Sequence, residues 1–548
     1  MSRYPNRCAY VQKLIFAMKK FSRSLLLGWC LGCAALAQNS APHAGSESQP
    51  PQSSAAHTVD SQTQADVAKQ VGSSLKQFID VLSTVQEQSA DQPPVDKMIY
   101  EGAIPAMLRE LDPHTQFFDP VQFQQLQQME QSEQKGFGSV VSVLPGQVIF
   151  LQTLPGTPSN KAGIQPGDEL VAVNNIAIGS LEPQQIIGLL TEARQQKVAI
   201  YVRRQGSPRV LQFTLTPALV DSPSVDRAFQ LQPGYGYIRV ASWDLQTAQQ
   251  LRDAIQKVGG TSLKGLVLDL RNNPGGIVRA ALDGASMFLH PGQRILTAKG
   301  RAGVSQTADV PANAEPYQFR LAVLVNGKTA SASEILSGAL QDHDRAVIVG
   351  EPSYGKGLVQ SVMPLSNGAG LAITTAFYYT PSGRSIQRPL RNSALSETFS
   401  DKPTGPLPTY KTDKGRKVVG GGGIEPDIRV EPHERTRLEV VLDGSGAITS
   451  FATQYLASHS PLPANFQVTP ELIDEFKVYL SARRIQPAVA EWAAERTWVS
   501  HRLQEEIVTQ ARGVDQGDEV QAQWDPQIQA ALSAIRTGDK LAANVAAH

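Results

Sequence analysis

The stretch Leu321-Ala-Val-Leu-Val-Asn-Gly-Lys-Thr-Ala-Ser331-Ala-Ser-Glu-Ile-Leu336 joins two kinds of local structure. Its first part is an uncharged apolar run, which is typical of a strand buried on both faces of a sheet. A turn of small residues follows, and the segment after Ser331 has the spacing of a helix. The surrounding sequence repeats this alternation, with strands expected at 265–270, 320–325 and 346–349 and helices at 277–289 and 331–342. The alternation predicts an α/β domain over residues 225–435, built on a largely parallel sheet.

Residues 134–217 change to the period of a strand. β-branched runs alternate there with glycine and proline turns, which predicts a small β-rich domain. The expected strands cover 139–143, 148–152, 169–173, 198–203 and 210–216, and one helix covers 183–192. Apolar residues at helical spacing predict a helical N-terminal region over 65–133 and a helical C-terminal region over 436–548.

The N-terminal segment has the composition of a secretory signal peptide. Lys19, Lys20 and Arg23 precede an apolar run that ends in Ala35-Leu-Ala37. We expect residues 1–37 to be a signal, residues 38–64 to be a disordered linker, and the protein to be exported to the periplasm or cell envelope. Membrane association would require an uncleaved signal or a lipid on Cys33, and Cys30 stands where a lipidation motif needs an aliphatic residue.

The composition and the missing motifs exclude several kinds of binding site and enzyme. Among the 548 residues, 50 Lys and Arg balance 50 Asp and Glu, so bulk charge gives the chain no affinity for nucleic acid. The cysteines are Cys8, Cys30 and Cys33, so the predicted domains contain neither disulfides nor cysteine-bound metals. The sequence lacks the motifs of zinc proteases, P-loop proteins and α/β-hydrolases. We therefore expect no metal and no cofactor.

Ser331 begins the predicted helix, and two roles compete for it. With Glu334 it forms S-x-x-E, a capping box that satisfies free backbone amides at a helix N-terminus. The same position suits a nucleophile, because the following amides and the helix dipole stabilise developing negative charge. Taken alone, the S-x-x-E motif favours the helix-capping role of Ser331.

A second segment favours the nucleophile role of Ser331 over the capping role. It is Ser353-Tyr-Gly-Lys356-Gly-Leu-Val-Gln360. If a strand begins at Gly357, the alternation of side chains puts Lys356 and Gln360 on one face. An ammonium has an ordinary pKa of about 10.4, so a lysine can deprotonate a serine only where burial keeps it uncharged. Gln360 can orient such an amine without charging it. The alternative is a surface lysine in a turn.

Two glycine-rich turns complete the candidate sites. In Leu268-Asp-Leu-Arg-Asn-Asn-Pro-Gly275-Gly276, a backbone N–H of one glycine could form an oxyanion hole with that of Ala332. In Lys135-Gly136-Phe137-Gly138-Ser139-Val140, the amides can bind a terminal carboxylate while the following strand accepts a peptide along its edge. Each motif alone is weak, and the alternative is an ordinary turn.

Together these motifs resemble the carboxyl-terminal processing (tail-specific) proteases, which are serine–lysine peptidases with a PDZ domain. The ordered series is D-P-H-T at 112–115, G-F-G at 136–138, D-L-R-N-N-P-G-G at 269–276, N-G-K-T-A-S-A-S-E at 326–334, Y-G-K-G-L-V-Q at 354–360, Y-Y-T-P-S-G-R-S-I-Q at 378–387 and G-I-E-P-D-I at 423–428. The resemblance implies a crotonase-like (ClpP-like) protease domain. It implies Ser331 as nucleophile, Lys356 as general base and Gln360 as its orienting residue. The implied oxyanion hole uses Ala332 with Gly275 or Gly276.

The resemblance also implies the substrates, which are proteins with apolar C-termini, captured by the PDZ-like domain and cut near that end. We therefore expect an exported serine endopeptidase. One alternative is a PDZ scaffold or chaperone with an inert protease domain, although the intact Ser331, Lys356 and Gln360 argue against it. An acyl-CoA hydratase on the same fold would leave the PDZ-like domain and the serine–lysine spacing unexplained. An adaptor protein and a homo-oligomer both remain open as partners.

Overall fold

The computed structural model describes residues 61–91, 94–130, 133–300, 305–389 and 407–537. The predicted signal peptide, the predicted linker up to residue 60 and residues 538–548 of the predicted C-terminal region lie outside this part of the chain. The helix α2 (Ser61–Gln88) begins before the predicted end of the linker at residue 64.

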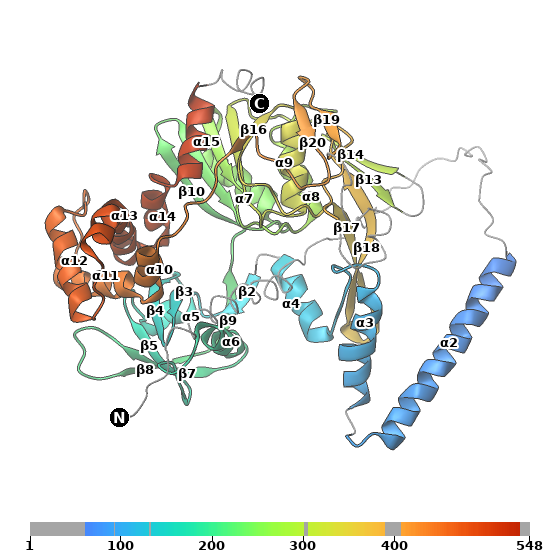
Figure 1. The fold of residues 1–548 in the computed structure, drawn as a ribbon, viewed down its shortest axis with the longest axis horizontal. Coiled ribbons are helices and arrows are strands. Elements are labelled where there is room, and N and C mark those ends of the chain that lie inside the picture. Colours follow the sequence, from blue (N-terminus) through green and yellow to red (C-terminus); the bar gives the residue numbers. More distant parts are fainter. Residues whose placement is uncertain (1–60, 92–93, 131–132, 301–304, 390–406, 538–548) are drawn as a thin grey trace, which may run out of the picture.

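A largely parallel sheet forms the centre of the molecule (Figure 1). Its strands lie in the order β10-β11-β12-β15-β16-β21, in which β10 and β11 pair antiparallel and the other neighbours pair parallel. The bounds are β10 Val225–Gln232, β11 Tyr235–Val240, β12 Gly265–Asp269, β15 Arg320–Val325, β16 Ala346–Gly350 and β21 Ile428–Arg429. The mixed α/β class predicted from the strand–helix alternation is confirmed.

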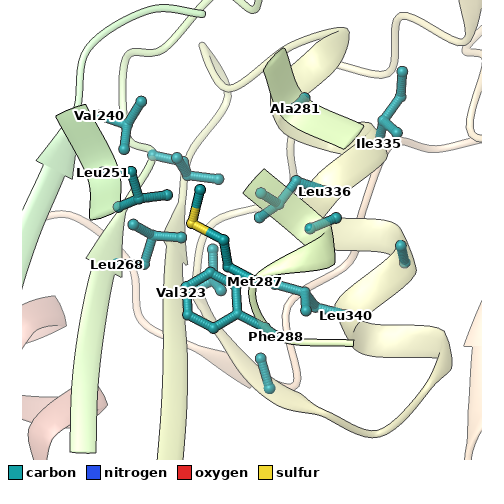
Figure 2. Close-up of a cluster of buried hydrophobic side chains, with 14 of the residues drawn as sticks. Val240, Leu251, Leu268, Ala281, Met287, Phe288, Val323, Ile335, Leu336 and Leu340 are labelled. Carbon is teal, nitrogen blue, oxygen red and sulfur yellow. The ribbon is translucent and has the colours of Figure 1, made fainter. Parts of the chain in front are cut away.

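Helices cover both faces of this sheet, because its inner strands are apolar on both sides. One face is covered by α7 (Thr247–Val258), α8 (Val278–Ser286) and α9 (Ala332–Asp342), which share a buried core with the strands. Figure 2 shows the middle of this core, which includes Leu268, Met287, Phe288, Val323 and Leu336. The other face is covered by α15 (Pro526–Thr537), from the C-terminal region.

A second sheet joins the N-terminal region to this α/β core. It is antiparallel, with strand order β1-β18-β13-β14, and β17 also pairs with β18. The bounds are β1 Gln116–Phe118, β13 Arg294–Gly300, β14 Ser305–Asp309, β17 Leu358–Pro364 and β18 Gly370–Tyr379. The residues just before β1 therefore lie near the strand that carries Gln360.

The β-rich region forms a separate sheet in the order β3-β4-β5-β7-β8, with β6 on β5 (Figure 1). The bounds are β3 Ser139–Leu144, β4 Gln147–Thr153, β5 Glu169–Val173, β6 Ile176–Ala177, β7 Val198–Arg203, β8 Leu211–Leu215, α5 Pro158–Ala162 and α6 Pro183–Ala193. The strands predicted at 139–143, 169–173 and 198–203 and the helix predicted at 183–192 are confirmed. The two segments that enter and leave this region pair as β2 (Glu133–Gly136) and β9 (Ala218–Asp221).

Helices make up most of the remaining chain. The N-terminal region also contains the π-helix η2 Lys97–Ala103, α3 Ile104–Arg109 and α4 Pro120–Glu130. The C-terminal region contains α10 Arg437–Gly444, α11 Ala447–Ser458, α12 Pro470–Ala482, α13 Val489–Arg512 and α14 Val514–Ala522. The first four of these helices share their own apolar core. Short elements are η3 Gly260–Ser262, η4 Ser366–Gly368, β19 Thr409–Lys411 and β20 Lys417–Val419. Within the described ranges, no helix is both long and apolar enough to cross a bilayer.

Candidate active site

The parallel sheet brings three sequence motifs to one edge. The strands β12, β15 and β16 are neighbours and run in the same direction. Their carboxyl ends lead into the turn with Gly275 and Gly276, the turn before Ser331 and the segment before Lys356. Carboxyl edges of parallel strands are where α/β folds commonly place their sites.

Ser331 occupies a strained position between β15 and α9. Its φ of 55° and ψ of −117° are rare for residues with a side chain and cost about 1–3 kcal/mol. Strain of this kind is typical of functional sites. Gly275, whose φ is 101°, packs against the serine, and a Cβ atom on Gly275 would lie 2.8 Å from Ser331 Cβ. The glycine turn and Ser331 are therefore in direct contact.

Lys356 and Gln360 lie together in the interior. Only 3% of Lys356 and 2% of Gln360 is exposed. Lys356 Nζ donates a hydrogen bond to Gln360 Oε1 at 2.7 Å. Along β17, Leu358 and Gln360 are buried while Val359 between them is partly exposed, as the predicted alternation requires. In the described chain, Lys356 forms no ion pair with a carboxylate.

Glu334 connects the segments that carry Ser331 and Lys356. Its carboxylate is fully buried and accepts hydrogen bonds from the backbone N–H groups of Ser331 at 2.8 Å, Gly355 at 2.6 Å and Lys356 at 2.9 Å. It also accepts from the Ser353 hydroxyl. Burial raises the pKa of Glu334, and these donors partly offset the shift. The S-x-x-E motif predicted only the bond from Ser331.

Tyr378 provides a second link, which sequence reasoning missed. Its hydroxyl lies 3.1 Å from Ser331 O and 2.8 Å from Lys356 O, so it contacts the backbone at both residues. In the sequence, Tyr378 is marked only as part of the Tyr-Tyr pair that opens the motif at residues 378–387. A tyrosine in a strand is an ordinary core residue, and nothing in its spacing indicates these partners.

His114 of the D-P-H-T motif also lies at this site. Its backbone oxygen accepts a hydrogen bond from Gln360 Nε2 at 2.5 Å. Burial lowers the pKa of its imidazole to about 4, and the Lys356 amine adds to this lowering when it is protonated, against a smaller opposing effect of Asp112. The ring is therefore uncharged at neutral pH. A lone histidine in sequence is an ordinary core residue in most proteins, so its neighbourhood could not be read from the motif.

The two glycines of the D-L-R-N-N-P-G-G motif differ in their contacts. Gly275 N–H donates to Asn273 Oδ1 at 2.9 Å, and Gly275 O accepts from Trp243 N at 3.0 Å. Gly276 packs on Trp243, where a Cβ atom would come within 1.9 Å of Trp243 O. Among the described residues, the N–H groups of Gly276 and Ala332 have no acceptor.

The predicted peptide-binding loop lies in the β-rich domain. Gly136, Phe137, Gly138 and Ser139 line a pocket of about 220 Å³, but Val140 does not line it. Apolar side chains complete the wall, including Val141, Phe150, Leu154, Leu170, Leu190 and Ile200. The pocket adjoins β3, an edge strand that pairs only with β4 in the described sheet. In the same described ranges, no cluster of His, Cys, Asp or Glu is arranged to hold a metal ion.

Comparison with known proteins bears directly on this arrangement. The family model described as peptidase family S41 matches residues 234–390, and the PDZ domain model matches residues 150–204. The carboxyl-terminal-processing protease of Synechocystis sp. is 36% identical over 293 residues, which cover 52% of this chain and 68% of that protein. The chain belongs to peptidase family S41. A second relative, the carboxy-terminal-processing protease of Bartonella bacilliformis, is 32% identical over 57% of this S41 chain and 72% of its own length.

This S41 protein is accordingly a serine peptidase of the carboxyl-terminal processing family, and it carries a PDZ domain. The resemblance seen in the motifs is confirmed. Among solved structures, the photosystem II D1 C-terminal processing protease is 27% identical to this S41 peptidase. It aligns with a TM-score of 0.35 over 64% of this chain and 86% of that protein.

Proposed function

We propose that this S41 peptidase cleaves peptide bonds with Ser331 as nucleophile and Lys356 as general base. The surroundings of the Lys356 amine carry the proposal: it is buried, it has no carboxylate partner in the described chain, and it donates to the neutral amide of Gln360. Burial without a counter-ion disfavours the charged form of an amine. An uncharged amine has the lone pair that a general base needs.

The reaction then follows the acyl-enzyme route. Lys356 Nζ removes the hydroxyl proton of Ser331 while Oγ attacks the scissile carbonyl carbon. The tetrahedral intermediate collapses as the new ammonium gives its proton to the leaving amine, and an ester on Ser331 remains. Water, deprotonated by the same amine, hydrolyses this ester and restores both groups.

We assign the oxyanion hole to the N–H groups of Gly276 and Ala332. Gly275 is the weaker choice, because its N–H already donates to Asn273. In a trans peptide the C=O and N–H groups point in opposite directions. Since Gly275 O accepts from Trp243, the N–H of Gly276 points away from Trp243. Ala332 begins α9, so its N–H adds the positive end of the helix dipole.

We further propose that the PDZ domain captures the C-terminus of a protein substrate. A peptide would extend the sheet along the free edge of β3, and its carboxylate would bind the amides of the G-F-G loop. The apolar wall of the pocket supports an apolar terminal residue. Cleavage near this end follows if the captured segment reaches Ser331.

The remaining proposals concern organisation and location. The proposed units are a signal at 1–37, a linker that ends before α2 begins at Ser61, a helical region from there to residue 133, the PDZ domain at 134–217, a crotonase-like protease domain at 225–435 and a helical C-terminal region at 436–548. The basic and apolar composition of the first segment supports export to the periplasm or cell envelope.

The catalytic proposal is tested by cleavage of an unfolded protein, followed on a gel. Ser331→Ala and Lys356→Ala should each lower the rate by about 10³-fold or more, because either change removes the activated nucleophile. Lys328→Ala is the matched control, since Lys328 is exposed in the turn before Ser331 and should tolerate the change. Peptide binding by the PDZ domain should persist in all three variants. Substantial cleavage by Ser331→Ala would overturn the proposal.

A further inference from the structure

The pair Lys356–Gln360 is hydrogen-bonded to a segment far away in the chain, the D-P-H-T turn (residues 112–115). Gln360 uses both ends of its amide: Oε1 accepts from Lys356 Nζ at 2.7 Å, and Nε2 donates to His114 O at 2.5 Å. The turn belongs to the N-terminal region, outside the residues 234–390 that match the S41 family model. The candidate general base is thus connected to a distant element through one side chain.

We propose that the D-P-H-T turn is a positioning element that determines which end of the Gln360 amide faces Lys356. A backbone carbonyl can only accept a hydrogen bond, so His114 O holds Nε2 toward the turn and leaves Oε1 facing the amine. In the opposite orientation, Nε2 would donate to the lone pair of an uncharged Lys356 and occupy the electrons needed to remove the Ser331 proton. This inference rests on the proposed role of Lys356 as general base.

The turn is built to hold that carbonyl in place. The Asp112 carboxylate, which is 1% exposed, accepts hydrogen bonds from His114 N at 2.7 Å and Thr115 N at 2.9 Å. Its second oxygen accepts from Thr115 Oγ1 at 2.6 Å. A buried carboxylate with donors from two successive amides and a hydroxyl fixes the backbone on both sides of the His114 carbonyl.

The same turn is also attached to the strand opposite Gln360. Thr115 Oγ1 accepts a hydrogen bond from Thr374 N at 3.2 Å, and Thr374 on β18 is the cross-strand partner of Gln360 on β17. The pairing of these strands shifts register between Val359 and Gln360. The unpaired residue is Thr375 on β18, so β17 keeps its alternation at Gln360. Thr115 therefore fastens the turn to the residue directly opposite Gln360.

The test compares Thr115→Val, which removes the hydroxyl at nearly constant shape, with Thr115→Ser, which keeps it. The readout is phosphonylation of Ser331 by a fluorophosphonate probe, analysed as a maximal rate and a binding constant. Thr115→Val should lower the maximal rate at least tenfold, with the binding constant changed by less than about twofold. Thr115→Ser should stay within about threefold of wild type in both the maximal rate and the binding constant. Asp112→Asn is the second variant, used if Thr115→Val does not fold.

A double-mutant cycle separates positioning from general support of the fold. In a Gln360→Ala background, Thr115→Val should change the rate by less than about twofold, because the side chain through which the turn acts is absent. An equal loss in both backgrounds, or equal effects of Thr115→Val and Thr115→Ser, would overturn the inference. Either of these outcomes would contradict the role of the turn without contradicting the proposed function. Unimpaired phosphonylation in Lys356→Ala would instead contradict the proposed function itself.

Discussion

At the scale of single residues, local spacing predicts local bonds and little else. The S-x-x-E motif predicts the hydrogen bond from Ser331 N–H to Glu334, and it is present at 2.8 Å. The donors from Gly355 and Lys356 follow the next strand and have no signature near Glu334. Strand alternation likewise places Lys356 near Gln360, but the acceptor on His114 lies 246 residues from Gln360 in the sequence. Such partners depend on the tertiary fold.

His114 gives a prediction about pH. The unfolded chain protonates this residue near the ordinary pKa of 6.5, whereas the folded protein does so only near a pKa of about 4. Between these values the unfolded state binds the extra proton, so the free energy of unfolding falls as the pH falls. The contribution of His114 to this fall in the free energy of unfolding is at most about 3 kcal/mol.

Urea unfolding of wild type and His114→Gln at pH 7 and pH 4.5 measures this contribution. The variant should lose less free energy of unfolding between the two pH values than wild type does, because glutamine does not titrate. The other histidines are common to both proteins and cancel in the comparison. An equal loss in both proteins would contradict the buried, uncharged state of His114.

At the scale of elements, hydrophobic periodicity predicts that a helix or a strand is present better than it predicts the residues at which that element begins and ends. The strand predicted at 198–203 coincides with β7. The helix predicted at 277–289 corresponds to α8, which ends at Ser286 because Met287 N and Phe288 N donate three residues back in a tighter turn. The apolar residues continue through Leu289, so hydrophobicity alone could not show where the helical hydrogen bonds stop.

The helix α6 provides the element-scale prediction for peptide capture. Leu190 lines the PDZ pocket, whereas Ile187, on the same helix, is 47% exposed and does not line it. Leu190→Glu should weaken binding of a labelled peptide with an apolar C-terminus at least tenfold, because it puts a charge against an apolar terminal side chain. Ile187→Glu should leave affinity within about twofold, as measured by fluorescence anisotropy. Similar losses in both variants would argue against this pocket as the capture site.

At the scale of the whole molecule, the C-terminal region is the part to which the sequence assigns no role. In the structure it contacts both other domains. Arg271, just before the Gly275–Gly276 turn, donates to Asp525 at 2.8 Å, and Val514 N donates to Gln152 of the PDZ domain at 3.0 Å. Amphipathic periodicity shows which face of a helix is apolar but does not show what that face covers. The contacts of this region therefore could not be predicted.

The packing of α15 predicts that this region stabilises the protease core. Leu532 is buried against the central sheet, and its neighbour Ser533 is exposed. Leu532→Ala should lower the free energy of unfolding by about 2–5 kcal/mol, because it leaves a cavity in a shared core. Ser533→Ala should change it by less than about 0.5 kcal/mol. Denaturant unfolding followed by tryptophan fluorescence measures both, and a Leu532→Ala protein as stable as wild type would exclude this role.

The charge of one amine decides the catalytic proposal, and NMR can read it directly. With carbon-13 at the ε position of the lysines, the Lys356 resonance is identified by its absence from the spectrum of Lys356→Ala. We predict that at pH 8 this resonance has the chemical shift of an uncharged amine and not that of an ammonium. A Lys356 resonance with the ammonium shift at pH 8 would contradict its role as the base that activates Ser331.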